Sequence, residues 1–209
     1  MNKTSTLFAA VFATVIPSVA LAAMLATALT DLNIRSGPGP EYPVIGLIQT
    51  QEQVNMIGCI EGSLWCQVTH KGREGWAYSQ YLATQSAGNR VIISERRPDV
   101  GVPAVTYSNT TGASVATGAV AGAIVAGPVG AVAGGVAGAM IDPPQQVRTY
   151  VTSNPADPVY LDGEVVVGAG LPESVQLRSV PDYNYRYVYV NRQPVLVDPA
   201  SRRIVYVYR

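Results

Sequence analysis

The sequence has few of the side chains that most catalytic and metal-binding sites require. Its 209 residues include one histidine, His70, and two cysteines, and only 13% of the residues are charged. Soluble domains ordinarily contain about 25%. Histidine-dependent triads and His-rich zinc sites therefore cannot be assembled in their usual form. Four glutamates, Glu41, Glu52, Glu61 and Glu74, lie scattered on turn segments, with no apolar surroundings to shift a pKa. We expect a protein that is not an enzyme, with no catalytic residues, no metal and no cofactor.

The sequence also lacks an excess of charge of either sign. Fourteen basic and fourteen acidic residues give a formal net charge of zero at pH 7. A balanced charge provides no global attraction to nucleic acid or to an anionic membrane. Nucleic acid is therefore not an expected partner.

Residues 1–22 have the order of a secretory signal peptide. Lys3 supplies the positive end, an apolar run covers residues 7–16, and Pro17 precedes the small-residue site Ala20-Leu21-Ala22. This order predicts cleavage after Ala22. A second site of the same kind, at residues 26–28, leaves the exact position open. The alternative is an uncleaved anchor, because no charge follows Lys3 until Asp31.

Export changes the interpretation of the two cysteines. Cys59 and Cys66 lie in β-type runs, residues 54–60 and 64–69, on either side of a turn-prone Glu-Gly-Ser. A hairpin would place them opposite each other, and an oxidising compartment would let them form a disulfide. The alternatives are a redox dithiol, although the spacing is not Cys-x-x-Cys, or half of a metal site with His70.

Residues 27–83 predict a small all-β domain. Short runs of alternating apolar residues are separated by Gly/Pro-rich turns and by Lys71-Gly72. Many short strands joined by tight turns favour a small barrel. Arg35 follows the first such run and precedes a Gly-rich turn, so we expect it to hydrogen-bond that turn rather than a ligand.

This segment resembles the bacterial SH3 domain family. The resemblance rests on Leu32-Asn33-Ile34-Arg35-Ser36-Gly37-Pro38-Gly39, Tyr42-Pro43-Val44-Ile45-Gly46, Trp65, Gly75-Trp76 and Tyr81-Leu82. One departure is Gln51-Glu52-Gln53, where the family usually has Lys-Gly. The resemblance implies a binding module of the cell envelope that contacts peptidoglycan or a peptide.

Four aromatic residues are the expected ligand-binding residues of this domain: Tyr42, Trp65, Trp76 and Tyr78. Rigid aromatic rings suit both sugar faces and peptide chains. The competing interpretation is that the two tryptophans pack in the core or across a hairpin.

Residues 84–111 mix polar residues with Gly and Pro, which predicts a linker with one short strand at 91–94. The next segment, residues 112–141, contains small residues at every fourth position, including Gly118, Gly122, Gly130, Gly134 and Gly138. On a helix this spacing gives a smooth strip against which another helix packs closely.

Pro128 predicts a break near the centre of this apolar segment. Each half is about 20 Å long as a helix, shorter than the roughly 30 Å hydrocarbon core of a membrane. We expect a helical hairpin, either membrane-inserted or self-associating; a single span and a flexible linker are the alternatives. The pattern resembles the glycine-zipper segments of Gram-negative envelope proteins.

Residues 147–209 form a second β-rich region. Strands are predicted at 148–152, 159–161, 164–167 and 175–177, followed by a meander with turns at 191–193 and 198–201. Tyr185, Tyr187 and Tyr189 alternate with other residues, so one face is tyrosine-rich and the other valine-rich. We expect the tyrosine face to be a packing surface; a binding surface is the alternative.

This region resembles the domain of unknown function 1236, found in envelope proteins of alphaproteobacteria. The resemblance rests on "GEVVVGAGLPESVQL", "YRYVYVNRQPVLVDP" and "RRIVYVYR". It implies no activity.

The expected fold is mainly β: an SH3-like small barrel, a central Gly/Ala-rich helical hairpin and a small C-terminal β-meander. The expected function is that of an exported binding protein in the periplasm or outer membrane of a Gram-negative bacterium. Its SH3 module would contact peptidoglycan or an envelope peptide or protein, and the glycine zipper would support membrane association or a homo-oligomer. The alternative is a structural protein of the outer membrane that assembles without a small ligand.

Overall fold

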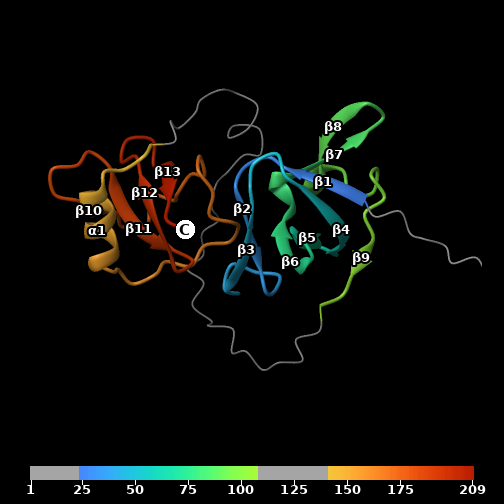
Figure 1. The fold of residues 1–209 in the computed structure, drawn as a ribbon, viewed down its shortest axis with the longest axis horizontal. Helices are drawn as coiled ribbons and strands as arrows, with labels where there is room; N and C mark the ends of the chain where they lie inside the picture. The colour runs from blue at the N-terminus through green and yellow to red at the C-terminus, as the bar shows by residue number, and fades with distance from the viewer. Residues whose placement is uncertain (1–23, 108–140) are drawn as a thin grey trace, which may run out of the picture.

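Two β-rich domains lie side by side in the computed structural model of the protein (Figure 1). The structure describes residues 24–107 and 141–209. The signal peptide expected at 1–22 and almost all of the expected helical hairpin lie outside the described residues, including Gly118, Gly122, Gly130, Gly134 and Gly138. Within the described ranges, no helix combines the length and the apolar character needed to cross a membrane.

The N-terminal domain is a nine-stranded sheet in the order β3-β2-β6-β5-β4-β1-β7-β8, with β9 beside β4. Two short 3-10 turns connect its later strands. The elements are β1 (Met24–Ala28), β2 (Leu32–Arg35), β3 (Val44–Ile48), β4 (Gln53–Ile60), β5 (Trp65–His70), β6 (Arg73–Tyr78), η1 (Ser79–Tyr81), β7 (Leu82–Ser86), β8 (Asn89–Ile92), η2 (Ile93–Glu95) and β9 (Ala104–Val105). The short strands joined by tight turns, as predicted for residues 27–83, are confirmed.

Strand β1 begins before the predicted start of the domain. It pairs antiparallel with both β4 and β7. Ala26 and Ala28 are 1% and 0% exposed and belong to the core, together with Leu32, Ile34 and Val54. The second small-residue cleavage site at 26–28 is therefore part of a central strand.

Residues 84–107, expected to belong to a linker, contain ordered elements of this domain. Strand β7 turns through Ala87-Gly88 into β8, and β9 pairs parallel with β4. Ile93 of η2 is fully buried, and Arg97 donates hydrogen bonds to Ile60 O and Ser79 Oγ, both at 3.1 Å. Strand pairing, the burial of Ile93 and the hydrogen bonds of Arg97 therefore hold this polar segment against the rest of the domain.

The predicted disulfide is confirmed. Cys59 of β4 and Cys66 of β5 are directly opposite each other in the hairpin and are joined by a disulfide bond. Both are buried, at 3% and 0% exposure. His70 lies elsewhere, at the far end of β5, with its Nε2 atom 3.1 Å from Glu52 Oε2.

The C-terminal domain is a four-stranded meander with one helix on it. Its sheet order is β10-β11-β12-β13, which confirms the predicted meander. The elements are α1 (Gln145–Ser153), β10 (Arg178–Ser179), β11 (Arg186–Val190), β12 (Gln193–Val197) and β13 (Ile204–Val207).

None of the four strands predicted before the meander forms as expected. Residues 159–161 contribute only an isolated bridge at Val159, and residues 175–177 are irregular, with strand β10 beginning after them at Arg178. The strand expected at 148–152 is part of helix α1, because Val147 and Val151 are one helical turn apart and both are buried in the same cluster. The strand expected at 164–167 is irregular, and this region joins the sheet only through single bridges such as Gly170 to Arg203. Val165 and Val166 are fully buried there, in the same hydrophobic cluster as the valines of the meander.

The tyrosine face of the meander is a packing surface, as expected. Helix α1 lies against it (Figure 1). The hydroxyl of Tyr187 donates a hydrogen bond to Asn154 O, and that of Tyr189 to Val151 O, both at 3.0 Å. The opposite face, with Val188, Val190 and Val195, joins the same hydrophobic cluster as the core of the N-terminal domain.

Removal of the disulfide should destabilise the N-terminal domain. The double variant Cys59→Ala/Cys66→Ala is expected to lose about 2–3 kcal/mol of unfolding free energy, because the bond closes a short loop in the unfolded chain. Urea unfolding followed by tryptophan fluorescence measures this, since both tryptophans lie in this domain. The reduced wild-type protein is the control and should match the variant. An unchanged unfolding midpoint in both would contradict the prediction.

Candidate functional site

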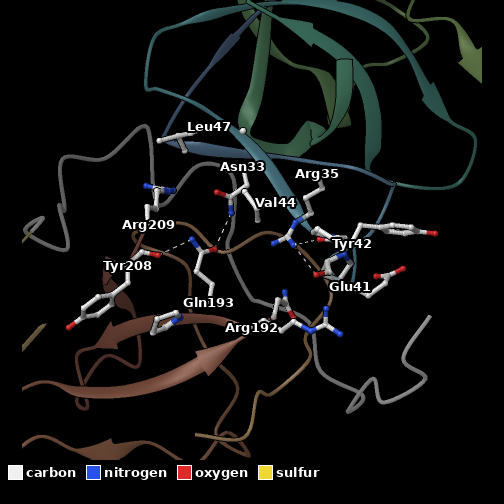
Figure 2. Close-up of a pocket in the computed structure, with 15 residues that line it drawn as sticks. Asn33, Arg35, Glu41, Tyr42, Val44, Leu47, Arg192, Gln193, Tyr208 and Arg209 are labelled. Carbon is white, nitrogen blue, oxygen red and sulfur yellow. Dashed lines mark hydrogen bonds between the residues drawn. The ribbon is translucent and has the colours of Figure 1, made fainter. Parts of the chain in front are cut away.

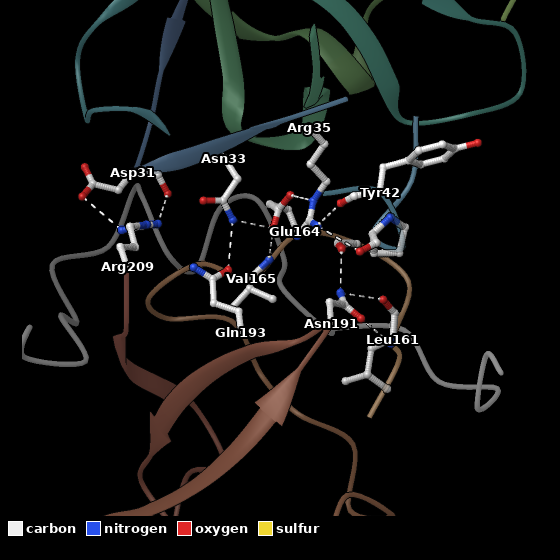
Figure 3. A network of polar contacts seen from close by, with 12 residues as sticks. Asp31, Asn33, Arg35, Tyr42, Leu161, Glu164, Val165, Asn191, Gln193 and Arg209 are labelled. Atoms are coloured by element: carbon white, nitrogen blue, oxygen red, sulfur yellow. Dashed lines mark hydrogen bonds and ion pairs between the residues drawn. The ribbon is translucent and has the colours of Figure 1, made fainter. Parts of the chain in front are cut away.

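A buried ion pair joins the two domains (Figure 3). Arg35, at the end of β2, donates from Nε to Glu164 Oε2 at 2.6 Å and from Nη2 to Glu164 Oε1 at 2.7 Å. The two side chains are 2% and 0% exposed. This is a bidentate guanidinium–carboxylate pair, the strongest geometry available to these groups.

Every remaining polar atom of this pair has a partner. Arg35 Nη1 donates to the carbonyl oxygens of Pro40 at 2.9 Å and Tyr42 at 2.8 Å, which confirms the predicted contact with the Gly-rich turn. Glu164 Oε1 also accepts hydrogen bonds from Asn33 Nδ2 at 2.9 Å and from the backbone N–H of Val165 at 2.7 Å. Buried charges are tolerated only when they are fully paired in this way.

The backbone around Arg35 is held by a close approach between strands. A Cβ atom on Gly75 of β6 would lie 2.8 Å from the carbonyl oxygen of Arg35. Glycine at this position therefore allows β6 to pack against the end of β2. The Gly75-Trp76 motif thus helps to place the Arg35 side chain.

Two further contacts extend the network along the domain boundary. Asn33 Nδ2 donates to Gln193 Oε1 at 3.1 Å, and Gln193 Nε2 donates to Tyr208 O at 3.2 Å. At the rim, Arg209 Nη1 lies 3.2 Å from Asp31 Oδ2, and Arg209 Nη2 donates to Asp31 O at 2.9 Å. Strand β2 and its flanks therefore bind the start of β12 and the end of β13.

A pocket of about 600 Å³ opens beside this network and is lined by both domains (Figure 2). The N-terminal domain contributes an apolar stretch that includes Pro43, Val44 and Leu47. Val44 is 46% exposed and is one of the few large hydrophobic side chains that the described part of the chain leaves in water. The charged lining residues include Glu41 from one domain and Arg192 from the other. The pocket is thus an apolar surface with charges at its edge, a common composition for ligand sites.

The four aromatic residues predicted to bind a ligand fall into two separate clusters. Trp76 and Tyr42 both pack edge-on against Tyr107, with ring centroids 5.4 and 5.8 Å apart. Trp65 and Tyr78 pack against each other at 5.3 Å. Both tryptophans are 5% exposed, so their rings serve the packing of the barrel.

Of these four residues, only Tyr42 lines the pocket between the domains. Burial, together with a hydrogen bond to Tyr107, raises the pKa of Tyr42 to about 12. The Tyr42 hydroxyl therefore keeps its proton at neutral pH. Its ring points away from the ion pair (Figure 3), while its backbone oxygen accepts from Arg35.

The described residues contain no group of three or more His, Cys, Asp or Glu side chains that could hold a metal ion. The histidine is paired with Glu52, which also accepts from Lys71. The hydrogen bond from Lys71 is the main reason that the pKa of Glu52 lies below its ordinary value.

Sequence reasoning missed Glu164, Asn33 and Arg192 as residues of interest. One available signal was the isolated charge of Glu164 inside the apolar run "GEVVVGAG". A charged residue within such a run, if buried, must have a partner. The identity of that partner could not be read from the sequence, because Arg35 lies 129 positions away.

Two known families match separate parts of the chain. Residues 30–83 match the family described as bacterial SH3 domain, and residues 150–209 match the family described as domain of unknown function (DUF1236). The resemblances predicted for these two domains are confirmed. The N-terminal domain is thus SH3-like, and the interdomain ion pair joins an SH3 segment to a DUF1236 segment.

The chain is also similar to part of a Bacillus subtilis (strain 168) protein that is provisionally named as an N-acetylmuramoyl-L-alanine amidase, YrvJ. The two are 31% identical over 71 residues. The aligned region covers 34% of this chain and 13% of the B. subtilis protein. The chain therefore corresponds to a small part of that relative.

Breaking the interdomain ion pair should destabilise the protein strongly. The variant Glu164→Gln keeps the shape of the side chain but leaves the Arg35 charge buried without a counter-ion, so we expect a loss of about 3 kcal/mol in unfolding free energy. Glu173→Gln, at an exposed position, is the matched control and should stay within about 0.5 kcal/mol of wild type. Equal denaturation midpoints for the two variants would contradict this assignment.

Proposed function

We propose that this protein is an exported cell-envelope protein that binds peptidoglycan or a wall-associated peptide. The observation that carries the proposal is the bacterial SH3 domain at residues 30–83. The B. subtilis relative, over the region it shares with this chain, supports it, because the name of that relative refers to N-acetylmuramoyl-L-alanine, the junction between glycan and peptide in the wall.

We propose a binding role rather than catalysis. The shared region covers 13% of the B. subtilis protein, a proportion that suits a common binding module better than a common active site. The single histidine supports this view, because it is buried and paired with Glu52. The proposal also includes membrane association or self-assembly through residues 112–141. The support for this part is the spacing of glycines at every fourth residue.

Binding to the wall is tested directly by sedimentation with purified peptidoglycan sacculi. We expect residues 23–209, purified in the oxidised form, to appear in the pellet with sacculi. Insoluble chitin, which has a related glycan without peptides, is the control and should leave the protein in the supernatant. A protein that stays in the supernatant with sacculi, or that pellets equally with chitin, would overturn the proposal.

Export is tested by the N-terminus of the mature protein. We expect cleavage after Ala22, because it leaves β1 intact. Cleavage after Ala28 would remove the strand that pairs with β4 and β7, together with the buried side chains of Ala26 and Ala28. The intact mass of protein recovered from the periplasmic fraction identifies the site. A chain that starts at Leu29, or that keeps residues 1–22, would contradict the prediction.

A further inference from the structure

The described part of the chain has three two-residue hairpin turns, and they differ in one respect. The turns are Lys71-Gly72, Ala87-Gly88 and Asn191-Arg192, each between strands paired at the flanking residues. All six residues have positive φ, with 76° at Gly72, 80° at Gly88 and 67° at Arg192. This conformation favours glycine at the second position. Of these three turns, the one beside the pocket has arginine at the second position. The choice of arginine at a position that favours glycine indicates that a requirement other than folding determines this residue.

The Arg192 side chain is held in place while its outer nitrogens remain available. Its Nε donates to the hydroxyl of Tyr160 at 3.0 Å, and the guanidinium carbon lies 5.9 Å from the centre of the Tyr160 ring. Its Nη1 and Nη2 atoms make no hydrogen bond to any described residue. Arg192 and Glu41 lie at the same end of the pocket (Figure 2), and no salt bridge joins these two described residues.

The residues beside Arg192 are fixed from both domains. The Asn191 side chain accepts from the N–H of Leu161 at 2.9 Å and donates to Leu161 O at 3.0 Å. Gln193 accepts from Asn33 of the N-terminal domain. The turn is therefore rigid, and its position relative to the apolar stretch of the pocket depends on the domain interface.

We propose that Arg192 is a ligand-binding residue, and that the pocket takes a short peptide with a free carboxylate. The two outer nitrogens of Arg192 suit a bidentate pair with that carboxylate. Glu41, at the same end, suits an amino group of the ligand, and the apolar stretch around Val44 suits small aliphatic side chains. The choice of a peptide stem of the wall as the source rests on the proposed function, since stem peptides carry all three kinds of group. The SH3 domain alone lacks Arg192, so the site is complete only when both domains are present.

The test uses the variant Arg192→Gly in the whole mature chain. Glycine relieves the positive φ, so the melting temperature should stay equal or rise. Calorimetric titration with the tetrapeptide stem of Gram-negative peptidoglycan should show about 10- to 100-fold weaker binding than wild type, as expected for loss of a charged hydrogen-bonded pair. The matched control is Arg186→Gln, which removes one charge from the exposed end of the same hairpin. Amidation of the peptide removes the carboxylates that Arg192 is proposed to bind. The amidated peptide should therefore bind the wild-type protein weakly, with the affinity that the unmodified peptide has for Arg192→Gly.

The outcomes separate this inference from the proposed function. Equal peptide affinity in wild type and Arg192→Gly, or an equal loss in Arg186→Gln, would overturn the role of Arg192. If wild type sediments with sacculi but does not bind the stem peptide, the pocket inference fails and the wall-binding proposal stands. If wild type binds the carboxylate peptide through Arg192 but does not sediment with sacculi, the pocket inference stands and the wall-binding proposal fails.

Discussion

The two domains of this protein meet around a pair of charges, Arg35 and Glu164, that water does not reach. Such a pair is tolerated only because every nitrogen and oxygen atom of the two charged groups has a hydrogen-bond partner. Three groups of the N-terminal domain complete these contacts. The Asn33 amide donates to Glu164, and the carbonyl oxygens of Pro40 and Tyr42 accept from Arg35. If either partner were absent, the other would be a buried unpaired charge. The domains are therefore expected to depend on each other, even though each matches a separate family.

This constraint also determines the position of the pocket. The Gly-rich turn that Arg35 holds continues into the apolar stretch with Val44, while the hairpin turn with Arg192 comes from the other domain. A site that needs both elements can form only when the interface is fixed. The SH3 fold explains why the protein is proposed to bind the wall. The joined domains explain why the proposed binding surface differs from that of an SH3 domain alone.

Much of the local structure follows from the sequence. Short alternating runs and turn residues predicted the short strands of the N-terminal domain, the meander and the opposition of Cys59 to Cys66. Helix α1 was missed because its β-branched residues favour strands, and only burial of Val147 and Val151 on one face makes it a helix. The ion pair could not be predicted, because its partners are 129 positions apart and nothing local links them. The aromatic residues chosen as a binding set fall into two packing clusters, since aromatic type alone does not distinguish a groove from a core.

We expect the buried pair to make the two domains one cooperative unit. Native-state hydrogen exchange of the mature chain tests it most directly, by comparing the most protected backbone amides of β5 with those of β12. One unit predicts the same free energy of opening for both strands, because neither domain opens without exposing the other half of the pair. A distinctly lower opening free energy for β12, with β5 still protected, would show that the C-terminal domain opens on its own and that the pair does not couple the domains.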